Sequence, residues 1–435
     1  MRELDAIVLA VDPLARVRIA GLTAKDRAVR VARRVGATRV RIVEHDSELA
    51  GTTAWYTNDR PLLVIRADQL VHTGLVAPLS EALPHDGVLA AVVPEAPAVQ
   101  DLTPGSFAGA LLASGPAATA LVATLASGAA LAMPTGATKI PHGNIARAPI
   151  ATPAERRAAH RLLYQILVKP QDNAITRYLY RPVSFPLTRM LVWTPITPNQ
   201  ISYAVAVLVA IGCWFTAYAS HGMALLGTVI ILLASYVDCC DGEVARVKLL
   251  SSRFGAWVDT IVDELSSVGY TIALGWHCRL AFGPKYFGDL SFDPWLVMTV
   301  IATAGMLVTI YCIYYALIVA IGSANSQDYV GSFEVAPGRD ATKVRLVPAA
   351  PRAIPTKREL PAWLQWLATY APYVIRRDFI AWGTVVLAVL HWTQVAFLGL
   401  ALGGVVTAVI VTIDHVRLRS LRRSLVRRGL VLEAP

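Results

Sequence analysis

Four aspartates with helical spacing are the residues of this chain best suited to chemistry. Asp238 and Asp241 are three residues apart, and Asp259 and Asp263 are four residues apart. On an α-helix, each spacing places both side chains on one face, one turn apart. The segment between the pairs is short, so a helical hairpin would bring the four carboxylates together.

A carboxylate cluster beside lipid requires compensating positive charge. One carboxylate in hydrocarbon costs about 2.5–3.5 kcal/mol, and four neighbouring ones also repel each other. Hard divalent cations take oxygen ligands. We therefore expect two Mg²⁺ or Mn²⁺ ions, roughly 4 Å apart, that bridge a pyrophosphate and stabilise the leaving oxygen. Simple pairing with Arg246, Lys248 and Arg253 is the alternative, but it leaves the accompanying glycines unexplained.

Two glycines and an arginine accompany the aspartates. Gly242 would let a ligand approach the backbone, and Gly255 would relieve crowding where the second helix starts. Arg246, one turn beyond Gly242, can pair with a phosphate group. The segment is therefore suited to binding a diphosphate.

The pattern D-x2-D-G-x2-A-R-x8-G-x3-D-x3-D resembles the signature of the CDP-alcohol phosphotransferases at every specified position. The resemblance covers roughly residues 160–420, including Thr197-Pro198-Asn199 before the first apolar segment. It implies an enzyme that moves a phosphoalcohol from a CDP-alcohol to an acceptor hydroxyl and releases CMP. It also implies a homodimer that associates through membrane helices.

The resemblance also implies individual residue roles. Asp238, Asp241 and Asp259 would bind two metal ions. Asp263 would contact the second ion and serve as general base on the acceptor hydroxyl, a role that agrees with its position farthest along the outgoing helix. The CDP site would consist of Asp238, Gly242, Ala245, Arg246, Gly255, Pro198 and Asn199.

The composition is that of a membrane protein. Hydrophobic residues make up 55% of the chain and charged residues 16%, and the mean hydropathy is +0.50. These values are too apolar for an ordinary soluble protein. The sequence predicts six membrane-spanning helices, near 199–219, 222–245, 255–280, 294–322, 377–395 and 397–416, with a polar turn at His391–Gln394 between the last two.

Charge asymmetry predicts the orientation. The loop 323–376 and the segment after the last span are rich in arginine and lysine, whereas the other loops are short or nearly neutral. By the positive-inside rule, the active site and both termini are expected on the cytoplasmic side. The first residues also lack the pattern of a cleavable signal peptide. The net charge of +10 is thus assigned to contact with anionic headgroups and not with nucleic acid.

Two arginines at the start of the fifth span are candidates for acceptor binding. Arg376 and Arg377 could reach an anionic acceptor such as a phosphorylated polyol. Ordinary anchoring at the cytoplasmic boundary explains them equally well.

Residues 1–145 are expected to form a cytoplasmic α/β domain of the Rossmann-like type. Strand-like runs occur at 5–11, 40–43, 62–65 and 88–93, and helix-like segments at 24–35 and 107–125. This alternation predicts a mostly parallel sheet with helices on both faces. The domain resembles a worn nucleotidyltransferase, because its first loop, Asp12–Arg16, lacks the glycines that cradle a triphosphate. Asp68 could be a remaining ligand of a metal site, or it could cap a helix. We expect this domain to be catalytically silent.

The remaining segments complete the predicted organisation. An amphipathic juxtamembrane region spans 146–197, the six-helix domain 198–420 and a basic cytoplasmic tail 421–435. The five cysteines lie in or beside the spans and lack metal-site spacing, so we expect buried thiols.

Three functional alternatives stay open. The N-terminal domain could itself make the CDP-alcohol, giving a bifunctional enzyme. An ion transporter would also contain membrane acids, but it would distribute them near the midplane of several helices. An inactive scaffold with this fold would not require the complete motif. The donor could be a CDP-inositol-like molecule or CDP-diacylglycerol, and the fused domain favours the former by analogy.

Overall fold

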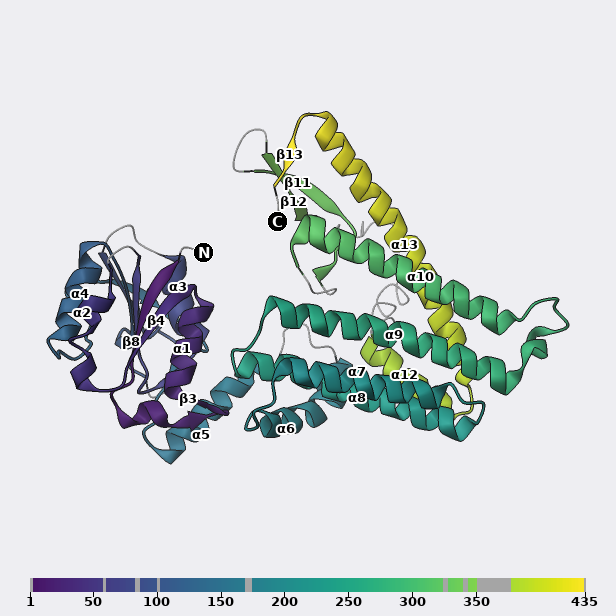
Figure 1. Cartoon of the computed structure of the whole chain (residues 1–435), viewed down its shortest axis with the longest axis horizontal. Coiled ribbons are helices and arrows are strands. Elements are labelled where there is room, and N and C mark those ends of the chain that lie inside the picture. The colour runs from purple at the N-terminus through teal and green to yellow at the C-terminus, as the bar shows by residue number, and fades with distance from the viewer. Residues whose placement is uncertain are drawn as a thin grey trace. The chain divides into compact units, whose positions relative to one another are not determined.

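The computed structural model describes residues 3–57, 60–82, 87–99, 102–168, 174–323, 328–338, 343–349 and 377–433 (Figure 1). The chain divides into two compact units. The first contains Met1–Asp172, Phe185–Ile196 and Glu243–Leu250, and the second contains Asn173–Ser184, Thr197–Gly242 and Ser251–Pro435.

The first unit is built around a six-stranded sheet. Its strand order is β4-β1-β5-β8-β7-β9. β1 pairs with β4 and β5 in parallel, β7 pairs with β9 in parallel, and β8 is antiparallel to both of its neighbours. The strands are β1 Leu4–Leu9, β4 Ala37–Val43, β5 Leu62–Arg66, β7 Gly87–Val92, β8 Phe107–Ser114 and β9 Thr138–Pro141.

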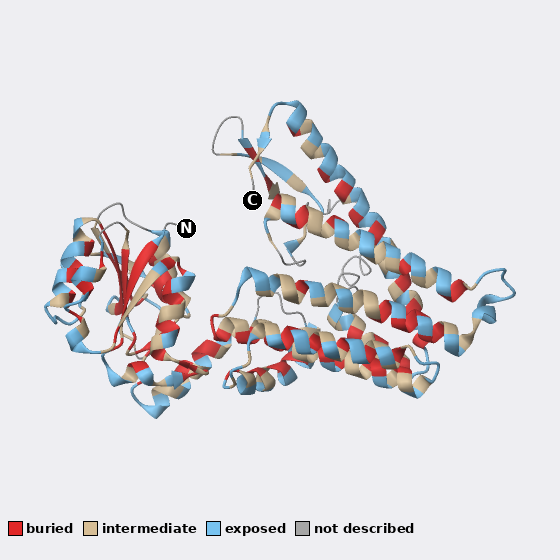
Figure 2. Cartoon of the chain, viewed as in Figure 1, coloured by how far each residue is buried: buried red, intermediate tan, exposed pale blue. Residues whose placement is uncertain are grey.

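Both faces of this sheet are buried by helices. Along β5, Leu63 and Ile65 join a core with residues of α1 (Ala24–Arg34) and α3 (Thr73–Glu81), while Leu62 and Val64 join a second core with residues of α4 (Pro116–Ala126). Adjacent strand residues point to opposite faces, so the two cores lie on opposite sides of the sheet. The predicted α/β fold with two covered faces is confirmed, and Figure 2 shows the buried central strands.

The prediction of a single helix-like segment over 107–125 was wrong in its first half. Residues Phe107–Ser114 form β8, Gly115 has a φ of 61°, and α4 starts only at Pro116. Seven of the eight β8 residues are buried. A fully buried run of Ala and Leu has no two-residue alternation, so its pattern cannot be separated from that of a buried helix.

Shorter elements complete the secondary structure of the described residues before residue 198. They are β2 Arg18–Ile19, β3 Leu22–Thr23, α2 Thr52–Trp55, β6 Leu70–Val71, β10 Arg147–Ala148, α5 Pro153–Tyr164 and α6 Arg181–Leu191, with short 3-10 or π turns at Pro13–Arg16, Asp46–Glu48, Gln165–Leu167 and Thr176–Tyr180.

The second unit is helical. Its helices are α7 Pro198–Thr216, α8 His221–Val247 as far as Gly242, α9 Arg253–Phe282, α10 Pro294–Ala316 with a π turn at Leu317–Ile321, α12 Arg377–Val389 and α13 Thr393–Arg427. Among the described residues, α7, α8, α10 with its π turn, and α13 are long and apolar enough to cross a membrane. Only 11% of the apolar window of α10 is buried inside the protein, as expected for a lipid-facing helix. The chain is therefore a membrane protein with four candidate spans in its described part.

A tight turn separates α12 from α13. His391 adopts a left-handed conformation with a φ of 63°, at the position where the sequence predicts a polar turn. Beyond it, Phe397 of α13 packs with Trp295 of α10 and Tyr270 of α9 in one apolar cluster. The turn thus directs α13 back into the helical core.

A small sheet covers one end of α10 and α13. β11 (Phe333–Pro337) pairs with β12 (Lys343–Pro348), and β12 pairs in parallel with β13 (Val431–Leu432). Val344 and Leu346 of β12 pack with Leu418 and Leu425 of α13. The hydrophobic periodicity of the sequence did not indicate these strands. All three are short, and β13 follows β12 by more than 80 residues.

The five cysteines are free. Cys240, Cys278 and Cys312 are buried, and Cys213 and Cys239 are partly buried. These positions agree with the expected apolar thiols.

Gly275 of α9 permits the close approach of two other helices. A Cβ atom there would lie 2.1 Å from the Thr299 hydroxyl and 2.7 Å from the Phe397 ring. We predict that Gly275→Val destabilises the detergent-solubilised protein by about 1–3 kcal/mol through overpacking. Gly399→Val on α13 is the control, because a Cβ at Gly399 would meet no atom within 4 Å. Equal unfolding temperatures for the two variants would contradict this packing argument.

Candidate active site

Three of the four aspartates meet at one point. Asp238 and Asp241 on α8 and Asp259 on α9 each offer a carboxylate oxygen, and these oxygens lie within 4.8 Å of one another. Asp241 is buried, and the other two are partly buried. This donor set suits a hard divalent cation, which prefers several carboxylate oxygens. The two spacings predicted a helical hairpin that brings the carboxylates together, and these three side chains do meet.

The fourth aspartate has a different partner. Both carboxylate oxygens of Asp263 contact the guanidinium of Arg377, one from each terminal nitrogen. Arg377 Nη2 also lies 3.7 Å from Asp238 Oδ2. The paired geometry is the strong form of an arginine–carboxylate contact. Asp263 thus lies beside the three-aspartate group and is connected to it through Arg377.

Arg377 has partners that the sequence did not predict. The sequence favoured either an acceptor ligand or a membrane anchor, whereas the structure directs its guanidinium at two of the motif aspartates. Its neighbour Arg376 lies outside the described residues. One guanidinium does not balance the charge of four carboxylates. The group therefore keeps a net negative charge, which favours the binding of cations.

Ser202 is a member of the site that sequence reasoning missed. Its hydroxyl donates a 2.6 Å hydrogen bond to Asp241 Oδ2, and the Gly242 amide donates to Asp241 Oδ1. Ser202 lies on α7 and is 3% exposed. These two donors orient Asp241. Ser202 could have been found from the sequence by its position three residues after Asn199, which places both residues on one helix face.

Two helix N-termini approach each other beside Gly255. The Asn199 side chain of α7 lies where a Cβ at Gly255 would be 2.9 Å from its Oδ1 atom. α7 begins with a capping box between Thr197 and Gln200, and α9 begins at the Ser252 cap, whose hydroxyl accepts from the Gly255 amide at 3.0 Å. Gly255 therefore has the predicted role of relieving crowding. Helix N-termini favour anions through their free amides and dipoles.

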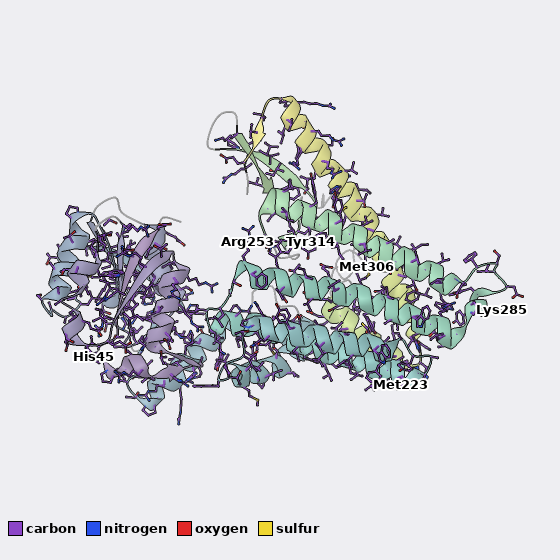
Figure 3. All side chains as sticks on the ribbon, viewed as in Figure 1. His45, Met223, Arg253, Lys285, Met306 and Tyr314 are labelled. Atoms are coloured by element: carbon purple, nitrogen blue, oxygen red, sulfur yellow. The ribbon has the colours of Figure 1, made fainter. Side chains whose placement is uncertain are left out.

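The helix beyond Asp263 is attached to α10. Glu264 accepts a 3.0 Å hydrogen bond from the hydroxyl of Tyr314, which is labelled in Figure 3. This bond holds the turn of α9 that carries Asp263. Of the CDP residues expected from the sequence, Ala245 and Arg246 occupy the last turn of α8, and Pro198 is the first residue of α7.

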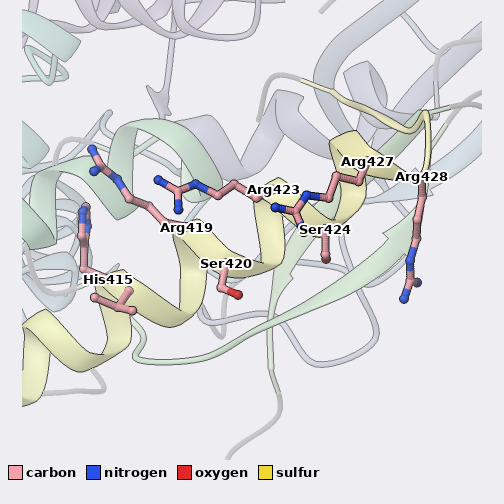
Figure 4. A pocket seen from close by; sticks show the side chains of 8 residues that line it. His415, Arg419, Ser420, Arg423, Ser424, Arg427 and Arg428 are labelled. Atoms are coloured by element: carbon pink, nitrogen blue, oxygen red, sulfur yellow. The ribbon is translucent and has the colours of Figure 1, made fainter.

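A separate basic groove lies along α13. Its lining comes from that helix and from Arg428, which directly follows it, and Figure 4 shows His415, Arg419, Arg423 and Arg427 in succession. Arg419 donates a 3.0 Å hydrogen bond to the Tyr311 hydroxyl of α10. The groove contains none of the four aspartates, so it is distinct from the carboxylate site.

The N-terminal domain presents few features of a nucleotide site. Asp68 pairs with Arg66, and the loop after β1 is closed by a 2.8 Å hydrogen bond from the Leu14 amide to Asp12. Asp12 thus acts as a helix cap and Asp68 as an ion-pair partner.

Comparison with known proteins identifies the region that contains the aspartates. Residues 195–397 match the family model described as CDP-alcohol phosphatidyltransferase. This part of the chain is therefore a CDP-alcohol phosphatidyltransferase domain, as the motif predicted.

Three relatives are similar over shorter segments. A "Bifunctional IPC transferase and DIPP synthase" of Aquifex aeolicus is 30% identical over 148 residues, which are 34% of this chain and 32% of that protein. One of the same name from Rubrobacter xylanophilus is 34% identical over 139 residues, 32% of this chain and 31% of that protein. A "CDP-diacylglycerol--inositol 3-phosphatidyltransferase" of Drosophila melanogaster is 33% identical over 91 residues, 20% of this chain and 36% of that protein. The chain spans about a third of the length of these curated relatives.

The Ser202 hydrogen bond provides a test of the carboxylate site. We predict that Ser202→Ala weakens Mn²⁺ binding to the purified protein by about tenfold, because groups that orient metal ligands typically have effects of that size. Isothermal titration calorimetry measures the affinity. Ser235→Ala is the matched control, because the Ser235 hydroxyl donates to the Ile231 carbonyl of its own helix. Equal Mn²⁺ affinities for the two variants would contradict the assigned role of Ser202.

Proposed function

From the CDP-alcohol phosphatidyltransferase domain at residues 195–397, we propose that this chain is a metal-dependent CDP-alcohol phosphotransferase. It transfers a phosphoalcohol group from a CDP-alcohol to an acceptor hydroxyl and releases CMP. The observation that carries the proposal is the meeting of three carboxylates from α8 and α9 within reach of one cation.

The residues present suit divalent metal ions. Asp238, Asp241 and Asp259 would hold Mg²⁺ or Mn²⁺, and Asp263 would contact the second of two ions. When bound, such ions neutralise the charge of a diphosphate and stabilise the leaving oxygen. The partly buried surroundings strengthen these electrostatic interactions.

The protein's own groups orient the reactants and move the proton. Asp263 receives the proton of the acceptor hydroxyl through an oxygen lone pair that Arg377 leaves available. Arg377 holds this carboxylate in position and offers its remaining donors to an anionic acceptor. The CDP moiety is bound by Asp238, Gly242, Ala245, Arg246, Gly255, Pro198 and Asn199.

The substrates belong to the inositol branch of this chemistry. Relatives named as IPC transferases and as an inositol phosphatidyltransferase support this proposal. The donor is either CDP-inositol-like or CDP-diacylglycerol. An acceptor that carries a phosphate would suit the exposed part of Arg377, whose side chain is 45% exposed.

The membrane arrangement follows the same proposal. In addition to the four candidate spans, α9 and α12 would cross the bilayer, giving six spans, with the aspartates and both termini on the cytoplasmic side. The arginines of the α13 groove would contact anionic headgroups. Two copies would associate through their membrane helices.

The N-terminal domain has two candidate roles. The names of the bifunctional relatives support synthesis of the CDP-alcohol by the same chain. The pairing of Asp68 with Arg66 argues against Asp68 as a metal ligand. We propose a structural or regulatory domain, with the bifunctional enzyme as the alternative. The family match favours either over an ion transporter.

A substrate panel tests the reaction. We expect purified protein with Mg²⁺ or Mn²⁺ to release CMP from at least one pair of CDP-alcohol and acceptor. Asp263→Asn should lower turnover by at least about a hundredfold, the typical contribution of a general base, while CMP still binds. Asp289→Asn, in an exposed loop pair with Lys285, is the control. Full activity of Asp263→Asn would exclude its role as the base.

A second arm of the panel replaces the CDP-alcohol with CTP and a phosphorylated alcohol. Formation of a CDP-alcohol by the wild-type protein would establish the bifunctional alternative. Pyrophosphate release is the readout.

Arg377 should affect the acceptor more than the donor. We predict that Arg377→Ala raises the acceptor KM by about tenfold or more, because a charge-assisted hydrogen bond to an anion is lost. The donor KM should change less. Arg279→Ala is the control, since Arg279 pairs with Asp293 near the opposite end of α9. An unchanged acceptor KM would leave Arg377 with only a charge-balancing role.

A further inference from the structure

The C-terminal end of α8 is held by the first compact unit. Residues Glu243–Leu250 belong to that unit together with the N-terminal α/β fold. The last four carbonyls of any helix have no partner within the helix and need other donors. In α8 these are the carbonyls of residues 245–248.

Two of the four carbonyls are satisfied by the local backbone. The Leu250 amide donates to the Ala245 carbonyl at 2.8 Å, and the Leu249 amide donates to the Arg246 carbonyl at 3.3 Å. This pair of bonds is the Schellman motif, in which the residue after the helix adopts a left-handed conformation. Leu249 does so with a φ of 55°.

The other two carbonyls are satisfied by arginines of α1. Arg27 Nη1 donates to the Val247 carbonyl at 2.8 Å, and Arg30 Nη1 donates to the Lys248 carbonyl at 2.7 Å. The two arginines are three residues apart and therefore share one face of α1. Together with the Schellman bonds, they complete the hydrogen bonding of the end of α8. Their positive charges also suit the negative end of its dipole.

Two features of this contact cost free energy: the burial of the charged Arg27 and the left-handed conformation of Leu249. Their presence indicates that the contact has a specific role. Arg27 is fully buried, and burial lowers its pKa to about 9. A buried charged side chain is retained only with well-placed partners, and Arg27 also donates to the Ile19 carbonyl at 3.1 Å. Leu249 adopts a conformation that disfavours side chains, yet its side chain packs in the apolar core beside α1. A leucine there is held by packing against the N-terminal fold.

Lys248 connects the same turn to a third segment. Its ammonium donates to the Thr194 carbonyl at 2.6 Å and to the Ile196 carbonyl at 3.2 Å. Thr188 of α6 donates to the buried Glu243 side chain at 2.6 Å. The last turn of α8 is thus fixed from two sides within this unit.

We propose that Arg27 and Arg30 are positioning residues for the CDP-alcohol, acting through the last turn of α8. That turn carries Ala245 and Arg246, so this inference rests on the proposed function. The N-terminal domain then serves transfer directly, by keeping the Arg246 backbone where its side chain can bind a donor phosphate. It does so whether or not the domain has a reaction of its own.

The test compares kinetics with backbone mobility. We expect Arg27→Met to raise the donor KM by about tenfold, the effect of losing one charge-assisted hydrogen bond. The acceptor KM and kcat should change by less than about twofold, because only uniform binding of the donor is lost. Arg27→Lys, which keeps one donor, should recover part of the affinity. Hydrogen–deuterium exchange should rise at the amides of residues 248–250 in Arg27→Met.

Arg33→Met is the matched control, because Arg33 lies on the same helix and is exposed. It should leave the donor KM and the exchange rates unchanged. Should Arg27→Met not fold, Arg30→Met carries the same test, since Arg30 is only partly buried. A folded variant with wild-type donor KM and wild-type exchange would overturn the proposal, as would an equal loss in donor and acceptor KM.

Failure of the proposed function gives a different result. In that case the wild-type protein releases no CMP with any member of the panel. The positioning role is then measured by CMP affinity in calorimetry and by the same exchange experiment. Unchanged CMP affinity in a variant with raised exchange would also overturn the role for the donor.

Discussion

The repulsion between neighbouring carboxylates is the constraint on which the helical unit depends. Asp238, Asp241 and Asp259 lie close enough to share one cation, and Asp263 lies beside them against Arg377. Carboxylates held this close near lipid are stable only with compensating charge. Arg377 contributes part of that charge from α12, and the Ser202 hydroxyl and Gly242 amide stabilise Asp241. The helices thus hold a group of carboxylates that could bind a cation.

The hairpin between α8 and α9 connects this group to the rest of the chain. α8 contributes two aspartates and then ends in a turn whose carbonyls are occupied by α1. α9 begins at the Ser252 cap, and its first turn admits Asn199 because residue 255 is glycine. Under the proposed positioning role, the N-terminal domain would support donor binding through the last turn of α8, with or without a reaction of its own.

Sequence spacing was sufficient for the features that depend on local geometry. The i, i+3 and i, i+4 spacings predicted a meeting of four carboxylates, of which Asp238, Asp241 and Asp259 come together. Apolar length predicted six spans, and four helices of the described residues are long and apolar enough to cross a membrane. Long-range partners were not predictable in this way. Arg377 is 114 residues from Asp263, and no local pattern distinguishes an arginine that reaches a carboxylate from one that anchors a helix. β8 was misread because complete burial removes the alternation that identifies a strand.

The three-stranded sheet at the end of α10 and α13 has a consequence for biogenesis. β12 lies between β11, which precedes it closely, and β13, which follows α13. During translation the hairpin of β11 and β12 therefore lacks its third strand until residues 431–432 have left the ribosome. Unpaired strand edges are sites of wrong association. A chain interrupted before residue 431 would therefore leave Lys343 and Val344 of β12 without their partner strand.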